Sequence, residues 1–248
     1  MRKSGILMHI SSLPSPYGIG TMGKAAYEFV DFLKSAGQAY WQILPLSPTG
    51  YGNSPYQSFS TYAGSPYLID LDTLIEEGLL KREEVEGVCW YKDKNRVDFG
   101  LQYENRLKVL KKAFARFTEN EAYRTFCGEN EDWLETFCLY MALKSASGGK
   151  PWYSWEEGLK RRNPDDLLKA SKALQEEMRF YRFTQYTFYR QWEALRNYAH
   201  QAGVEIIGDV PIYVPMDSCE VWSSPQLFEL DENLQPLRVA GCPPDAFT

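Results

Sequence analysis

Gly5-Ile-Leu-Met-His-Ile10 and Tyr40-Trp-Gln-Ile-Leu-Pro-Leu46 are the two apolar runs that decide the fold at the start of the chain. Neither contains Asp, Glu, Lys or Arg, and uncharged apolar runs of this length are typical of buried strands. Between them, apolar residues recur at helical spacing over residues 26–33, and Gly37 follows as a helix terminator. The first fifty residues therefore predict a β-α-β unit with two parallel strands and a right-handed crossover.

A third strand is predicted much later, in Val204-Glu-Ile-Ile-Gly-Asp-Val210. The residues before it show helical spacing in several stretches, and they are too many for a simple connection between a strand and a helix. We therefore predict a parallel α/β fold with a large helical insertion. Three parts are expected: residues 1–70 with the first βα units, residues 71–203 as an inserted helical subdomain, and residues 204–248 with the third strand and a loop-rich segment.

Residues 51–67, called the aromatic loop below, follow the second predicted strand directly. The loop reads Tyr51-Gly-Asn-Ser-Pro-Tyr-Gln-Ser-Phe-Ser-Thr-Tyr-Ala-Gly-Ser-Pro-Tyr67 and carries no charged residue. Aromatic rings can pack on the apolar faces of a sugar, while hydroxyl and amide groups can bind its hydroxyl rim. Nucleic acid would require nearby Lys or Arg. Two interpretations remain open: a sugar-binding loop, or an aromatic cover over the end of the core.

The whole chain of 248 residues has a globular composition and a net charge of −6. This acidic balance disfavours nucleic acid or an anionic membrane as a partner. No apolar stretch is long enough to span a bilayer, and residues 5–10 are too short for the core of a signal peptide. Five cysteines without C-x-x-C spacing and only two histidines disfavour a zinc site, and predict free thiols in the reducing cytoplasm.

Asp209 and His9 are the two strand-associated polar residues with a candidate role. Asp209 ends an apolar strand and precedes Pro211, so its carboxylate would point into a site if the strands form a parallel barrel. The alternative for Asp209 is a local cap of backbone amides. His9 lies within the first apolar run, and a buried, hydrogen-bonded histidine is the expectation there.

Two further motifs match known functional patterns, but their sequence context does not support a functional site. Gly18-Ile-Gly-Thr-Met-Gly23 matches the G-x-G-x-x-G pattern, but it lies several residues after the strand and lacks an acid for a ribose about twenty residues on. We interpret its glycines as a tight entry into the helix rather than as a nucleotide site. Arg96-Val-Asp98 resembles the segment that holds a glycosidase nucleophile, but it follows a polar stretch and is expected in a solvated loop.

Five segments, in this order along the chain, resemble the amylomaltases, or disproportionating enzymes, which are 4-α-glucanotransferases of the α-amylase superfamily. They are Ser12-Leu-Pro-Ser-Pro-Tyr-Gly-Ile-Gly20, Asn53-Ser-Pro-Tyr-Gln-Ser-Phe-Ser60, Ala63-Gly-Ser-Pro-Tyr-Leu-Ile-Asp70, Gly208-Asp-Val-Pro-Ile-Tyr-Val214 and Val239-Ala-Gly-Cys-Pro-Pro-Asp245. The resemblance implies a (β/α)8 TIM barrel with inserted subdomains. It also implies transfer of α-1,4-glucan segments between maltooligosaccharides by a retaining double displacement, with no cofactor.

The resemblance assigns sugar contacts to three residues of this chain. Tyr56 matches the tyrosine that stacks under the sugar at the cleavage point, Ser54 matches a nearby contact, and Asp209 matches a ligand of sugar hydroxyls. A mobile lid over the acceptor side is implied at Pro243, Pro244, Asp245 and Phe247, with Ala246 standing where an aromatic residue is common.

The three catalytic carboxylates of the resembled family lie on later barrel strands, so we expect them beyond residue 248. About three barrel strands are predicted within this chain, which is expected to be the N-terminal half of such an enzyme and inactive alone. The alternative is a non-catalytic α-glucan-binding module that uses the aromatic loop as its platform.

Overall fold

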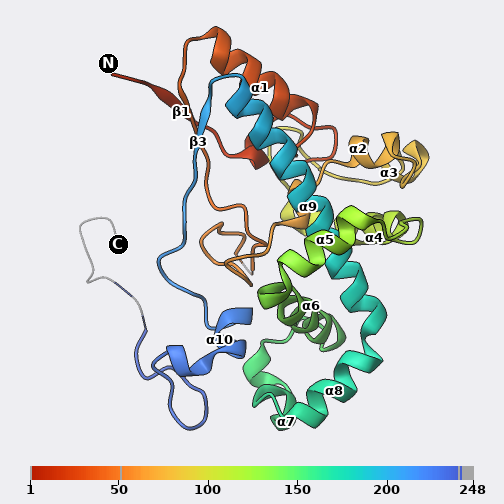
Figure 1. Cartoon of the computed structure of the whole chain (residues 1–248), viewed down its shortest axis with the longest axis vertical. Helices are drawn as coiled ribbons and strands as arrows, with labels where there is room; N and C mark the ends of the chain where they lie inside the picture. The colour runs from red at the N-terminus through yellow and green to blue at the C-terminus, as the bar shows by residue number, and fades with distance from the viewer. Residues whose placement is uncertain (1, 51, 240, 242–248) are drawn as a thin grey trace.

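The computed structural model describes residues 2–50, 52–239 and 241 (Figure 1). These residues form a small parallel sheet, a set of helices and four short 3-10 helices. The strands are β1 (Gly5–Leu7), β2 (Tyr40–Gln42) and β3 (Glu205–Ile207). The helices are α1 (Lys24–Ser35), α2 (Leu71–Glu76), α3 (Arg82–Glu86), α4 (Phe99–Phe114), α5 (Glu121–Glu129), α6 (Glu131–Ala146), α7 (Glu157–Lys160), α8 (Pro164–Ala173), α9 (Gln175–Gln201) and α10 (Cys219–Ser223). The 3-10 helices are η1 (Ile10–Ser12), η2 (Pro66–Leu68), η3 (Trp152–Ser154) and η4 (Pro225–Leu227).

The three strands are parallel and run in the spatial order β1-β2-β3. All three predicted strands are present, but each is shorter than its apolar run. The ladder continues only one residue past the strands, where Met8 N donates to Gln42 O and Ile43 N donates to Ile207 O. Beyond that point Pro45 has no N–H to donate, and the chain after β1 turns into η1.

The two faces of this sheet have different surroundings. Ile6, Trp41 and Ile206 occupy one register level, and α1 and α9 run along this side of the strands (Figure 1). The ring of Phe29 in α1 packs edge-on against Trp41, with 5.2 Å between the ring centroids. The next register level holds Leu7 and Ile207, which are 55% and 43% exposed. The described residues therefore cover only one face of the sheet.

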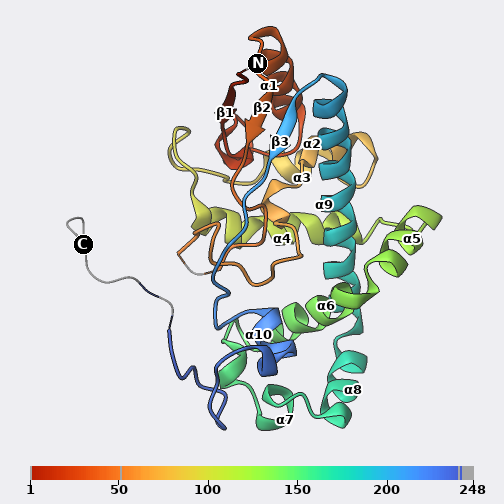
Figure 2. The same ribbon diagram turned by 60° about the vertical axis from the view of Figure 1, so that its left-hand side comes forward.

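Helix α9 connects the sheet to the helical region. It has 27 residues, which corresponds to a length of about 40 Å at 1.5 Å per residue. Figure 2 shows it passing from the neighbourhood of β3 to the group formed by α5, α6 and α8. It contacts α4, α5, α6, α1 and β3. Glu177 and Arg182 near its start pair with α4 and α6, and Tyr198 near its end binds Asp31 of α1. The apolar side of this one helix thus packs both against the sheet region and against the helical region.

Two buried glutamines on α9 bind the backbone of the chain between the aromatic loop and α2. Gln185 accepts from Gly64 N at 2.7 Å and donates to Gly64 O at 3.0 Å. Further along the same helix, Gln191 accepts from Asp70 N at 2.7 Å and donates to Asp70 O at 3.1 Å. Each amide side chain therefore satisfies both polar groups of one buried residue, as a neighbouring strand would.

Gly64 fits this arrangement because a side chain would not. A Cβ atom at Gly64 would lie 2.0 Å from the ring of Phe188, which follows Gln185 on the same helix. The absence of a side chain lets the backbone approach α9 closely enough for Gln185 to reach both its N–H and its C=O.

The glycines of the G-x-G-x-x-G pattern have a packing role as well. A Cβ atom at Gly20 would lie 2.0 Å from Ile10 O, and one at Gly23 would lie 2.1 Å from the carboxylate of Asp70. Gly18 has φ of 73°, in the left-handed region. This agrees with the interpretation of these glycines as a tight entry into α1. Asp98, weighed above as a glycosidase-like residue, instead caps α4 by accepting from Leu101 N at 3.0 Å.

Replacement of Gln185 by leucine is expected to lower the free energy of unfolding by about 3 kcal/mol, because two buried backbone groups of Gly64 lose their partners. Urea denaturation followed by tryptophan fluorescence measures the change. The matched control is Gln201→Leu at the exposed last position of α9, which is expected to change stability by less than about 0.5 kcal/mol. Equal effects of the two substitutions would contradict the role given to Gln185.

Candidate functional site

Tyr56 and Asp209 meet although 153 residues separate them in sequence. Tyr56 lies in the aromatic loop after β2, and Asp209 lies two residues after β3, so each follows the carboxyl end of a neighbouring parallel strand. The phenol of Tyr56 donates to Asp209 Oδ2 at 2.7 Å. Both side chains are exposed, and Tyr56 retains 42% of its accessible surface. An open aromatic ring and an open carboxylate therefore lie side by side at this end of the sheet.

The two oxygens of Asp209 have different partners. Oδ1 accepts from Val210 N at 2.8 Å, which is the local cap considered above, and Oδ2 accepts from Tyr56. The hydrogen bond to Asp209 raises the pKa of the Tyr56 phenol above its ordinary value, and desolvation and the carboxylate charge act in the same direction. Tyr56 consequently remains protonated and continues to donate at neutral and mildly alkaline pH.

Ser54 shapes the turn that presents Tyr56. Its Oγ accepts from Tyr56 N at 3.3 Å, and its carbonyl oxygen accepts from Gln57 N at 3.0 Å. The preceding Asn53 has φ of 57°, a left-handed conformation that asparagine tolerates better than most residues. Ser54, Tyr56 and Asp209 thus form one hydrogen-bonded series. The implied lid residues Pro243, Pro244, Asp245, Ala246 and Phe247 lie outside the described residues.

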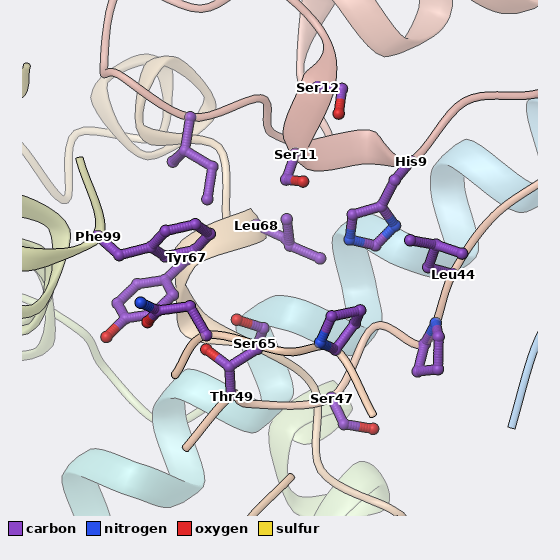
Figure 3. A pocket seen from close by; sticks show the side chains of 14 residues that line it. His9, Ser11, Ser12, Leu44, Ser47, Thr49, Ser65, Tyr67, Leu68 and Phe99 are labelled. Carbon is purple, nitrogen blue, oxygen red and sulfur yellow. The ribbon is translucent and has the colours of Figure 1, made fainter. Parts of the chain in front are cut away.

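A cavity of about 170 Å³ lies beside this series, between the chain that follows β1 and the aromatic loop (Figure 3). Asn53 and Pro55 contribute to its wall, but Tyr56 and Asp209 do not. His9 and Thr49 also line it, and His9 Nδ1 and Thr49 Oγ1 are buried without a hydrogen-bond partner among the residues that the structure describes. His9 was expected to be buried and hydrogen-bonded, but it is only half-buried and its Nδ1 has no partner among the described residues, because the ring faces this cavity.

Sequence reasoning missed the charged pair beneath the aromatic loop. Lys144 of α6 is almost fully buried and contacts Asp217 Oδ2 at 2.6 Å. Asp217 Oδ1 accepts from the Tyr140 hydroxyl at 2.8 Å and more weakly from Trp152 N at 3.3 Å. The only available signal was a lysine on the apolar side of a predicted helix, and nothing in the local pattern identifies a partner 73 residues away.

Comparison with known proteins shows the family to which this chain belongs. A family model described as 4-alpha-glucanotransferase matches residues 8–248. The chain belongs to this 4-alpha-glucanotransferase family.

The 4-alpha-glucanotransferase of Thermus thermophilus is 49% identical over the whole chain, and that of Clostridium butyricum is 47% identical over 97% of it. The chain spans about half the length of each relative, with 50% of both covered.

A solved structure extends the match to three dimensions. The amylomaltase from Streptococcus agalactiae in complex with acarbose is 44% identical to this chain. It superimposes with a TM-score of 0.96 over 100% of this chain and 51% of its own. This likeness confirms the predicted fold class, a partial (β/α)8 barrel with a large helical insertion.

A pH dependence of stability is expected from His9. Burial lowers the pKa of its imidazole below the ordinary value of about 6.5, so the folded state binds this proton less readily than the unfolded state. Stability from this residue is therefore complete above about pH 6.5 and decreases as the pH falls through the folded pKa. Thermal melting between pH 7.5 and 5.0 should show a shallower loss in His9→Gln than in the wild type. Parallel curves would contradict this assignment.

Proposed function

We propose that residues 1–248 form the donor-side sugar-binding part of a 4-α-glucanotransferase that acts on maltooligosaccharides and other α-1,4-glucans. The observation that carries the proposal is the Tyr56–Asp209 pair at the carboxyl ends of β2 and β3. In parallel α/β barrels, active sites are built from the loops at this end of the strands. The names of the relatives and the acarbose in the Streptococcus agalactiae structure support the same class of ligand.

The chemistry of the pair suits a pyranose ring. The face of Tyr56 offers an apolar surface to the C–H groups of a sugar, and the carboxylate of Asp209 accepts hydrogen bonds from sugar hydroxyls. The hydrogen bond between the two side chains orients both before a ligand arrives, which reduces the entropy lost on binding. Ser54 supports the pair through the Tyr56 amide and is proposed as a further contact.

The proposed reaction is a retaining double displacement. A carboxylate attacks the anomeric carbon and forms a glycosyl-enzyme, while a carboxylic acid protonates the leaving oxygen. The hydroxyl of a second sugar then accepts the glycosyl group, and the acid returns as a base. We propose that these carboxylates come from the part of the protein that the chain does not cover, as its half-length match to the relatives suggests. The role of residues 1–248 is to hold and orient the sugar.

The proposal extends to organisation and location. We propose residues 1–70 and 204–248 as parts of the catalytic barrel and residues 71–203 as the helical insertion. Among the described residues, no helix has the length and apolar character to cross a membrane. Cys89, Cys127, Cys138 and Cys219 are free thiols in the structure, which supports a proposed cytoplasmic location.

Substitutions at the pair are expected to lower transfer in the full-length protein with maltotriose as substrate. Tyr56→Ala removes the ring and should reduce kcat/KM at least tenfold, equivalent to about 1.4 kcal/mol. Tyr56→Phe keeps the ring but loses the contact with Asp209, so an intermediate reduction is expected. Asp209→Asn should reduce kcat/KM while the melting temperature changes by no more than about 2 °C.

The matched control is Tyr103→Ala, which removes an exposed tyrosine from the surface of α4 and should leave transfer unchanged. Product analysis by chromatography measures both the ladder of longer maltooligosaccharides and the released glucose. Wild-type protein that yields neither product would overturn the enzymatic proposal. Calorimetric binding of maltotriose by such an inactive protein would instead favour a glucan-binding module. Normal turnover in Tyr56→Ala would remove Tyr56 from the site.

A further inference from the structure

A single carboxylate on the chain that follows β3 binds the aromatic loop at three points. Glu220, in the first turn of α10, accepts through Oε1 from Ser60 Oγ at 2.8 Å, Thr61 N at 2.8 Å and Thr61 Oγ1 at 3.1 Å. Hydrogen bonds to an ionised acceptor are about twice as strong as those between neutral groups. This contact lies only four to five residues from Tyr56 along the loop.

The neighbours of Glu220 strengthen the same contact. Cys219 N donates to Phe59 O at 2.8 Å, and the side chain of Ser218 caps α10 by accepting from Val221 N at 3.3 Å. The cap fixes the direction of the short helix, and the Cys219 amide then adds a backbone bond to the loop. Residues 59–61 are thus bound along their length by Cys219 and Glu220.

The chain segment that leads into α10 is itself attached to α6. The ammonium of Lys144 lies 4.7 Å from the centroid of the Phe59 ring and 2.6 Å from Asp217. Asp217 is bound in turn by Tyr140 and Trp152, so the chain before α10 is attached to α6. An ion pair withdrawn from water stabilises a fold only when further hydrogen bonds satisfy its remaining polar atoms; Lys144 is buried and Asp217 half-buried, and Tyr140 and Trp152 supply such bonds to Asp217.

Hydrogen bonds also join the two sides of the part of the aromatic loop that carries Tyr56. Gly50 N donates to Gln57 O at 2.8 Å, and Phe59 N donates to Pro48 O at 3.2 Å. The Ser58 hydroxyl lies 2.9 Å from Pro48 O and 2.6 Å from Ser60 O, and it donates its single proton to one of these two carbonyls at a time. Because these bonds cross-link residues 48–60, a shift at Ser60 displaces Tyr56 as well.

We propose that Glu220 is a positioning residue that sets Tyr56 against Asp209. The same stretch of chain carries both acids: Asp209 meets the ring that would touch the sugar, and Glu220 fixes the loop from which that ring projects. Glu220 acts through Tyr56 and does not itself contact the sugar. This inference rests on the proposed function for its kinetic consequence, but the contact can be tested without substrate.

The first experiment measures amide hydrogen exchange in the ligand-free full-length protein. In Glu220→Ala, exchange over residues 52–61 is expected to rise at least tenfold, because three bonds to the loop are lost, while exchange in α1 stays at the wild-type rate. Glu220→Gln keeps an acceptor at Oε1 and should restore part of the protection.

Asn120→Ala is the matched control for this experiment, because it removes the N-cap of α5, which accepts from Tyr123 N at 2.8 Å. It should lower the melting temperature without changing exchange in residues 52–61. Unchanged exchange over these residues in Glu220→Ala would overturn the proposal, whatever the activity of the protein.

The second experiment is a double-mutant cycle on kcat/KM for maltotriose in the full-length protein. Glu220→Ala is expected to lower kcat/KM about tenfold, with partial recovery in Glu220→Gln. The variant that combines Glu220→Ala with Tyr56→Ala should be within about twofold of Tyr56→Ala alone, because both changes act on the same side chain. A purely structural role would lower the melting temperature and leave kcat/KM unchanged, which overturns the proposal, as would additive losses in the double variant.

The two experiments separate failure of this inference from failure of the proposed function. If Tyr56→Ala leaves transfer normal, the double-mutant cycle on kcat/KM shows that Tyr56 does not contact the sugar. The exchange measurement still decides whether Glu220 holds the loop. If exchange over residues 52–61 rises in Glu220→Ala but not in Asn120→Ala, and the losses in the cycle are not additive, both hold.

Discussion

The structure depends on two glutamine side chains that stand in for a neighbouring strand. The segment from Gly64 to Asp70 is buried against α9 and has no sheet beside it, so its backbone groups would otherwise lose their hydrogen bonds with water. Gln185 and Gln191 supply a donor and an acceptor each. Since an unsatisfied buried backbone group costs about 1–3 kcal/mol, this segment could not pack on α9 without them.

This anchorage explains how an uncharged aromatic loop holds a fixed shape. Its C-terminal end is bound to α9 through Gly64, and residues 59–61 are bound to α10 through Glu220 and Cys219. The exposed part of the loop that carries Tyr56 is therefore fixed on one side by the bonds at residues 59–61 and on the other by the hydrogen bond from Tyr56 to Asp209. An open surface on a rigid support would limit the entropy lost on binding if the proposed ligand docks at this loop.

The fold was predictable from the sequence to the extent that its signals are local. Three apolar runs predicted three parallel strands, and the helical spacing over residues 26–33 predicted α1, whose ends agree with the glycines around it. The strands proved shorter because proline and η1 interrupt the ladder. Tyr56, Ser54 and Asp209 were named through resemblance to a family, whereas nothing in the sequence identified a partner for Glu220 or Lys144. A single acidic or basic residue in a helical pattern has the same appearance whether it faces solvent or a buried partner.

The sequence by itself therefore determined the three strands, the helix between the first two, a helical stretch before the third, and the neutral aromatic character of the loop. Each of these follows from residues a few positions apart, where backbone sterics and local hydrogen bonds act. Only the tertiary structure decided that Tyr56 meets Asp209, that Gln185 meets Gly64 and that Glu220 meets Thr61. These pairs are 121 to 159 residues apart, and their meeting depends on parallel strands that bring the following loops to one edge of the sheet.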